Sequence, residues 1–139
     1  MMRFYVVVDT NVLVSALLSK HEDAATVQVL NRLFGDDVGF LYSNDIEKEY
    51  AEVLNRPKFN FPKESIDYLL GSIRKYGILL NPKASGAVLP DMKDLPFYEL
   101  VLEKREDNAY LVTGNIKHFP KEPFIVTPNE LLNILDNKQ

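Results

Sequence analysis

The sequence predicts an α/β fold with a mainly parallel central sheet. Residues 4–8 (FYVVV) are consecutive apolar residues rich in Val, a pattern typical of a strand buried on both faces of a parallel sheet. Similar short apolar runs recur along the chain, and amphipathic helical patterns separate them. Strands that alternate with helices favour parallel pairing through crossover connections. Asp9 follows the first run directly, where open α/β sheets bind ligands.

The expected elements follow one another in a regular order. Strands are expected over 4–8, 38–43, 78–81, 109–113 and 124–127. Helices are expected over 11–19, 23–34, 44–56, 63–77, 94–106 and 127–135. Residues 81–93 contain Pro, Gly and Ser and are expected to form a loop. The third helix should stop just before Pro57, because the residue before a proline disfavours helical backbone.

Capping residues predict where several helices begin. Thr10 or Asn11 is expected to cap the first helix, and Asn44 followed by Glu47 resembles a capping box for the third. The last helix, in the segment TPNELLNIL, has the clearest start signal. Thr127 is the expected cap, Pro128 the first helical residue, and Glu130 completes a capping box.

Composition limits the class of protein. A length of 139 residues suits a single domain over residues 1–139, and the absence of cysteine excludes a disulfide scaffold, a thiolate metal site and a cysteine nucleophile. No apolar run approaches the ~20 residues of a membrane span, and the N-terminal run lacks a signal-peptide pattern. We therefore expect a cytoplasmic protein with no membrane partner. The net charge of −4 means that affinity for phosphates requires a local basic patch or a metal ion.

Four polar positions stand beside apolar runs: Asp9, Glu49, Asp94 and Asn115. Two of them follow predicted strands and Asp94 begins a predicted helix, and such ends gather at one edge of a right-handed α/β sheet. Three carboxylates at one edge repel one another unless a hard divalent cation neutralises them. Mg²⁺ prefers oxygen ligands, and a bound cation polarises phosphoryl oxygens and lowers the pKa of bound water. The pattern therefore points to phosphodiester hydrolysis.

Four segments carry a family resemblance: VVVDTNVLVSALLS, EKEYAEVLNRPKF, DLPFYELVLEKREDNAYLVTGNIKHFP and IVTPNELL. In order and spacing they resemble the PIN-domain family, and most closely its branch of toxin components of toxin–antitoxin systems. DTNVLVSAL and YLVTGNIKHFP are the specific parts, whereas the middle helices are not. The resemblance implies a small α/β/α sandwich and cleavage of RNA that depends on Mg²⁺ or Mn²⁺. It also implies a homodimer and an antitoxin partner.

The resemblance assigns roles to particular acids. Asp9, Glu49 and Asp94 match the acidic motif residues, which implies that they hold the metal ion and are catalytic. Each also has a simpler interpretation. Asp9 and Asp94 are in positions where an Asp caps a helix. Glu49 lies on a helix face that is usually solvated, next to Glu47 and Glu52, and the preference for Glu49 comes from the family match alone.

Asn115 is a departure from the fullest acidic pattern of the family. Many members have a fourth Asp there, whereas an amide oxygen ligates a cation weakly and adds no charge. We expect weaker metal affinity and one bound ion rather than two, with Asn115 still counted among the catalytic residues. After Gly114, ordinary turn chemistry also explains this residue. Asn11 and Thr113 match polar residues that support the acidic centre, and Asp91 is interpreted as a loop residue.

Basic residues near these positions are candidate RNA contacts. Lys117, His118 and Lys121 follow Asn115 in the sequence, and Arg56 follows the helix of Glu49. Together with Lys58 they would form a basic rim around a negative centre, which suits RNA cleavage. The alternative is ordinary solvated charge. His118 is more often a surface or packing residue than a general base in such a context.

Other functions fit the sequence less well. Asn11 stands where haloacid dehalogenase-like phosphatases need a second Asp, and residues 42–45 (YSND) poorly match the phosphate-accepting centre of receiver domains. No Gly-rich phosphate loop and no nucleophile elbow is present in the sequence. The main alternative is a non-catalytic RNA- or protein-binding module that retains the PIN fold and has lost cleavage together with the fourth Asp.

Overall fold

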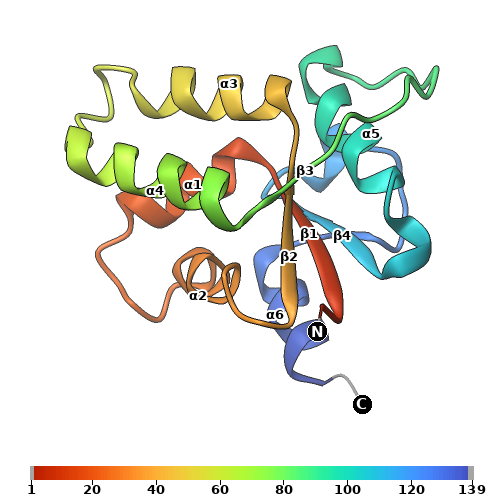
Figure 1. Ribbon diagram of the computed structural model, residues 1–139, viewed down its shortest axis with the longest axis horizontal. Helices are drawn as coiled ribbons and strands as arrows, with labels where there is room; N and C mark the ends of the chain where they lie inside the picture. The colour runs from red at the N-terminus through yellow and green to blue at the C-terminus, as the bar shows by residue number, and fades with distance from the viewer. Residues whose placement is uncertain (1, 138–139) are drawn as a thin grey trace.

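A five-stranded sheet lies at the centre of the computed structural model, which describes residues 2–137 (Figure 1). The strands are arranged in the order β3-β2-β1-β4-β5, and each neighbouring pair is parallel. Their bounds are β1 Phe4–Val8, β2 Val38–Tyr42, β3 Ile78–Leu79, β4 Ala109–Val112 and β5 Ile125–Val126. The expected parallel α/β fold is therefore confirmed.

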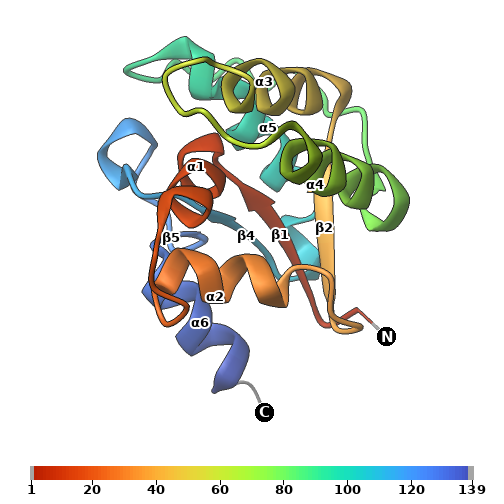
Figure 2. The same cartoon turned by 90° about the vertical axis from the view of Figure 1, so that its left-hand side faces the viewer.

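Helices cover both faces of this sheet and make it the middle layer of an α/β/α sandwich. The α-helices are α1 Thr10–Leu18, α2 Ala25–Arg32, α3 Asn44–Leu54, α4 Lys63–Tyr76, α5 Leu95–Leu102 and α6 Pro128–Asp136. Three short 3₁₀ helices are η1 Met92–Asp94, η2 Arg105–Asp107 and η3 Ile116–His118. α1, α2, α4 and α6 lie on one face, and α5 packs against β1, β2 and β4 on the other (Figures 1 and 2).

The strand order reverses at β1, so that the topological switch point of the sheet lies between β1 and β4. The chain builds the sheet outward from β1 to β2 and β3, then crosses back and adds β4 and β5 on the other side of β1. Ligands of open α/β sheets bind at the carboxyl ends of the strands beside such a switch point. Val6, Val7 and Val8 are completely buried, so the strand that precedes Asp9 is fixed in the core.

Several expected boundaries are corrected by the structure. The strand expected over 78–81 is only Ile78–Leu79, and the helix expected over 23–34 is Ala25–Arg32. The helix expected over 94–106 ends at Leu102, after which a separate 3₁₀ turn forms. Periodicity does not mark these ends, because apolar residues continue past α2 and β3, and the charged residues 103–106 that follow α5 are common inside helices.

The prediction of a capping box at Asn44 is wrong. Ser43 is the N-cap of α3, and its hydroxyl accepts a 3.2 Å hydrogen bond from the backbone N–H of Ile46. The Ser43 backbone is extended, as a capping residue requires, whereas Asn44 is already helical. The capping box of the last helix is confirmed, with Thr127 and Glu130 bonded reciprocally. Within residues 2–137, no helix combines the length and apolar character needed to cross a membrane.

Candidate active site

Asp9 lies at the carboxyl end of β1, next to the end of β4. The side chain is buried, with 5% of the residue exposed, and its Oδ2 accepts a 2.7 Å hydrogen bond from the hydroxyl of Thr113. Thr113 immediately follows β4 and is completely buried. Burial raises the pKa of Asp9, and hydrogen bonds from Thr113 and from the backbone N–H groups of Thr10 and Asn11 oppose this shift. The carboxylate is therefore held in place at the switch point of the sheet.

α3 brings Glu49 to the same region. Ile46, Tyr50 and Leu54 form the buried face of the helix, and Glu49 is half-buried at the border of that face. The Tyr50 hydroxyl donates a 2.6 Å hydrogen bond to the backbone carbonyl oxygen of Val8, which ties α3 to the last residue of β1. Glu49 itself accepts a hydrogen bond from the Thr10 hydroxyl.

Asp94 comes from the junction of η1 and α5. The residue occupies the N-cap position of α5, but its side chain makes no capping hydrogen bond, so the expected capping role is wrong. Asp91 instead caps η1, where its Oδ1 accepts a 3.0 Å hydrogen bond from the backbone N–H of Lys93. Among the described residues, the buried Oδ2 atom of Asp94 has no hydrogen-bond partner. His118 Nδ1 lies 3.5 Å from this oxygen, close enough for an ionic attraction.

The electrostatics of Asp94 indicate that the acids are close to one another. Burial is the largest cause that raises its pKa, and the negative charges of Asp9, Asp91 and Glu49 raise it further. His118 opposes the shift, and the result is a pKa of about 6. A carboxyl group so perturbed in a cleft is a common feature of functional sites, because structural carboxylates usually have lower pKa values.

Asp9, Glu49 and Asp94 line one cavity of about 470 Å³, called the acidic pocket below. Six acids and three basic residues contribute to its wall, which gives the pocket a local excess of negative charge. The complete lining is Asp9, Thr10, Asn11, Asp45, Lys48, Glu49, Glu52, Val53, Arg56, Asp91, Lys93 and Asp94. The structure thus brings together the three acids that stand 40 to 85 positions apart by numbering.

The donor chemistry of the acidic pocket fits a hard divalent cation. Every candidate ligand is a carboxylate oxygen, and among the described residues the buried Oδ2 of Asp94 accepts no hydrogen bond. Within residues 2–137, however, no group of three or more Asp, Glu or His side chains is already close enough together to hold an ion. Glu49 is bonded to Thr10 and Asp9 to Thr113, so the acids share a pocket without forming a closed cage.

Of the remaining predicted residues, only some contact the acidic pocket. Asn115 is half-buried and is not among the residues that line it; its backbone N–H donates a 2.9 Å hydrogen bond to Thr113 Oγ1. Lys117 and His118 are exposed on η3, and Lys121 is exposed further along the chain. Arg56 lines the pocket and is also exposed. Asn115 thus reaches Asp9 through Thr113 and not by direct contact.

Sequence reasoning missed the roles of Thr10 and Tyr50. Thr10 was expected only as a helix cap, but its hydroxyl is the hydrogen-bond partner of Glu49. Tyr50 was assigned no role from the sequence, although it lies next to Glu49. The hydroxyl of a buried Tyr usually makes a hydrogen bond, so a Tyr on the apolar face of a helix could have predicted such a bond. This pattern does not name the partner, which is a backbone oxygen 42 positions earlier in the chain.

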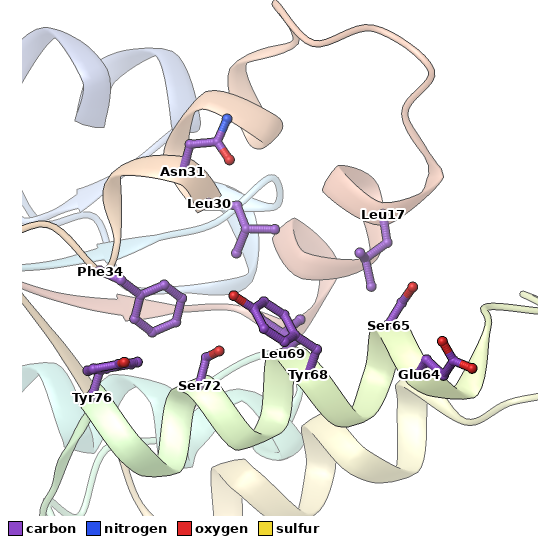
Figure 3. Close-up of a pocket in the computed structure, with 10 residues that line it drawn as sticks. All are labelled: Leu17, Leu30, Asn31, Phe34, Glu64, Ser65, Tyr68, Leu69, Ser72 and Tyr76. Atoms are coloured by element: carbon purple, nitrogen blue, oxygen red, sulfur yellow. The ribbon is translucent and has the colours of Figure 1, made fainter.

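A second cavity lies between α4 and the pair α1 and α2 (Figure 3). Its volume is about 670 Å³, and its walls are mainly apolar and aromatic, with Leu17, Leu30, Phe34, Tyr68 and Tyr76 among them. Glu64 is the single acid among its lining residues. The carboxylate chemistry therefore belongs to the acidic pocket and not to the larger cavity.

Comparison with known families agrees with this architecture. A family model described as PIN domain matches residues 5–117, which include Asp9, Glu49, Asp94 and Asn115. The chain belongs to the PIN-domain family. PIN domains are generally nucleases and typically bind divalent metals, so the family supports a hydrolase of the nuclease type. Searches of curated proteins and of solved structures gave no significant match.

Proposed function

We propose that this chain is an endoribonuclease that requires Mg²⁺ or Mn²⁺ and acts in the cytoplasm as the toxin component of a toxin–antitoxin system. The observation that supports the metal-dependent chemistry best is the acidic pocket at the switch point of the sheet. Asp94 shares this pocket with Asp9 and Glu49, and its buried Oδ2 accepts no hydrogen bond from the described residues. The toxin role depends on the sequence resemblance.

Asp9, Glu49 and Asp94 would hold the cation. When bound, such a cation polarises a phosphoryl oxygen and lowers the pKa of a water molecule, which is the chemistry that phosphodiester hydrolysis needs. The hydroxyls of Thr113 and Thr10 orient the carboxylates of Asp9 and Glu49, so that little reorganisation is required when the substrate binds.

Basic side chains are proposed to hold the RNA backbone. Arg56 lines the acidic pocket, and Lys117, His118 and Lys121 are exposed and follow β4 in the sequence. Cations in these positions attract phosphates toward a centre that is otherwise negative. We assign these residues to substrate contact, and Asn115 to the support of Asp9 through Thr113.

A cleavage assay tests the proposal. A labelled single-stranded RNA and a DNA of the same sequence are incubated with Mg²⁺ or Mn²⁺, with EDTA as the control. We expect metal-dependent cleavage of the RNA only, a loss of at least about a hundredfold for Asp9→Asn, and a smaller loss for Asn115→Ala. Asp45→Asn is the matched control, because Asp45 lines the same pocket on the exposed side. Equal losses for all three variants would contradict the assignment.

The alternative is a non-catalytic RNA- or protein-binding module. Two observations favour it: Asn115 replaces a fourth acid, and the described residues contain no preformed group of three ligands. In that case RNA binds without metal and is not cleaved. A thermal shift with Mn²⁺ separates the two functions, because a bound ion raises the melting temperature of the native state and Asp9→Asn abolishes this rise.

The proposed partners are a second copy of the chain and an antitoxin protein, both implied by the resemblance. Light scattering on the purified chain tests the homodimer. Induced expression in bacterial cells tests the toxin role, with growth arrest expected for the natural chain and normal growth for Asp9→Asn. Normal growth with both chains, at equal protein levels, would contradict a toxin function.

A further inference from the structure

The loop between α3 and α4 is basic although the protein is acidic. From Val53 to Lys63 the chain has three cations, Arg56, Lys58 and Lys63, and no acid, against a net charge of −4 for the whole sequence. All three cations are exposed. A local positive patch is the feature that a phosphate ligand of an acidic protein requires.

Ion pairs neutralise these cations only in part. Arg56 lies 3.9 Å from Glu52, and Lys63 lies 3.2 Å from Asp67, but the side chains of both pairs are largely exposed. Exposed pairs of this type contribute roughly 0–1 kcal/mol, so an incoming phosphate competes with them easily. Lys58 Nζ lies 5.1 Å from the centre of the Phe59 ring and makes a cation–π contact.

A cavity of about 260 Å³ opens in this loop and is called the loop pocket below. Arg56 and Lys63 contribute cations to its lining, Phe61 contributes an aromatic ring, and Asn55 and Asn60 contribute polar side chains. The volume is slightly below the roughly 300 Å³ at which pockets for drug-sized ligands begin. Positive charge, a ring and amides together match the parts of a nucleotide, which are a phosphate, a flat base and its polar edge.

The loop pocket is held in shape by the loop itself. The Phe61 ring stacks on Phe59, with centroids 5.3 Å apart and planes 11° from parallel. Backbone hydrogen bonds of 3.1 Å join Phe59 to Arg56 and Asn60 to Pro57 and close successive turns. Binding at a preorganised surface loses little conformational entropy, so a few contacts are enough for useful affinity.

Arg56 connects the loop pocket to the acidic pocket, because it lines both cavities. α3 carries Glu49 in its middle and ends at Leu54, immediately before the loop. In Figure 2 the loop crosses above α1, the helix that directly follows Asp9. A strand of RNA that places one phosphate among the acids therefore has a basic and aromatic surface directly beside it.

We propose that the loop pocket binds one nucleotide of a single-stranded RNA substrate, next to the phosphate that is cleaved. Arg56 and Lys63 contact backbone phosphates, and the base packs against Phe61. This inference rests on the proposed ribonuclease function and adds to it a subsite outside the metal centre. An acidic peptide would satisfy the cations but would leave the ring without a flat partner, which favours RNA.

Fluorescence anisotropy with a short, unstructured, labelled RNA tests the subsite in EDTA, where cleavage does not interfere. Lys63→Gln should weaken binding about three- to tenfold at low salt and reduce the slope of log affinity against log salt by about 0.7. Phe61→Leu should weaken binding at least about fivefold. Lys20→Gln is the matched control, because it makes the same charge change just beyond the far end of α1.

A second probe separates base contact from folding. A ribose-phosphate chain of the same length without bases should bind the natural protein and Phe61→Leu equally well, whereas Lys63→Gln should still lose affinity. The subsite proposal would be overturned if Phe61→Leu lost the same factor in affinity for the RNA and for the ribose-phosphate chain. It would also be overturned if both variants bound RNA as tightly as the natural protein does. Displacement of the RNA by polyglutamate at equal charge concentration would also overturn it in favour of a protein partner.

The outcome is independent of whether the chain cleaves RNA. If RNA binds through Lys63 and Phe61 but is never cleaved with metal present, the ribonuclease proposal fails and the subsite stands. If RNA is cleaved by the natural chain and equally well by Lys63→Gln and Phe61→Leu, the subsite fails and the ribonuclease proposal stands.

Discussion

Thr113 donates a 2.7 Å hydrogen bond from its hydroxyl to Asp9 Oδ2, across the boundary between β4 and β1. The two residues are 104 positions apart in the chain, and both are buried. The same hydroxyl oxygen accepts a 2.9 Å hydrogen bond from the N–H of Asn115. One side chain therefore orients the central carboxylate and fixes the loop that follows β4.

Thr113→Val tests this arrangement, because it preserves shape and removes the hydroxyl. The change leaves a buried carboxylate with one partner fewer, which should lower the free energy of unfolding by about 1–3 kcal/mol at pH 8. The loss should be smaller at pH 4 than at pH 8, because burial raises the pKa of Asp9 and its carboxyl group carries less negative charge at the lower pH. Urea unfolding at both pH values measures it. Thr113→Ser keeps the hydroxyl, and an equal loss in that variant would contradict the hydrogen-bond explanation.

The hydrogen bond between Tyr50 and Val8 gives a second test. The Tyr50 hydroxyl is completely buried and bonds the carbonyl oxygen of Val8 at 2.6 Å. Tyr50→Phe should cost about 1–2 kcal/mol of unfolding free energy and should weaken Mn²⁺ binding, because α3 then holds Glu49 less firmly relative to β1. Tyr68→Phe is the control at an exposed tyrosine. An unchanged Mn²⁺ dissociation constant would restrict Tyr50 to a role in stability.

The central part of the fold could be predicted from the sequence because its signals are local. The run FYVVV is confirmed as β1 without a change of boundary, and the capping box at Thr127 is confirmed as well. The ends of β3 and α5 could not be predicted in this way. The end of β3 depends on where its pairing with β2 stops, and α5 ends where the Glu103 N–H bonds the carbonyl oxygen of Leu100 in a tighter turn. Leu80 and Glu103 do not differ in type from residues inside such elements.

The acidic residues of the site could be predicted from the sequence, but the contacts among its side chains could not. Asp9 and Asp94 were expected at one edge because strand and helix ends meet there. The bond from Thr10 to Glu49 joins residues 39 positions apart, and the approach of His118 to Asp94 depends on how η3 packs. Such contacts depend on the relative placement of whole elements, which residue types and spacing do not encode.

Asp94 should make the stability of the metal-free protein depend on pH. Its pKa is about 6 in the native state against 3.8 as the ordinary value, so the native state binds more protons than the unfolded state between about pH 4 and pH 6. Asp94 therefore favours the native state below pH 4, and this contribution is lost as the pH rises through 6. The full pKa change corresponds to about 3 kcal/mol, and because solvent screens this partly exposed carboxyl group we expect a difference of about 1–2 kcal/mol between these limits.

Asp94→Asn isolates this contribution. In EDTA the variant should be more stable than the natural chain at pH 7 and should lose the advantage near pH 4, as measured by urea unfolding. Subtraction of the two curves removes the effect of the other carboxylates. A constant difference between the natural chain and Asp94→Asn across this pH range would mean that Asp94 titrates normally. Asp36→Asn is the control for an exposed acid that does not line the acidic pocket.

Asn115→Asp tests whether the loop after β4 belongs to the metal site. Asn115 does not line the acidic pocket, but its N–H is bonded to the hydroxyl that holds Asp9. A carboxylate there would add negative charge near Asp9 and Asp94, so Mn²⁺ should bind roughly tenfold more tightly and the metal-free protein should become less stable. Calorimetric titration measures the affinity. Asn133→Asp on α6 adds the same charge elsewhere, so an equal gain in Mn²⁺ affinity in that control would mean that net charge alone causes the effect. An unchanged Mn²⁺ dissociation constant in Asn115→Asp would exclude Asn115 from the metal site.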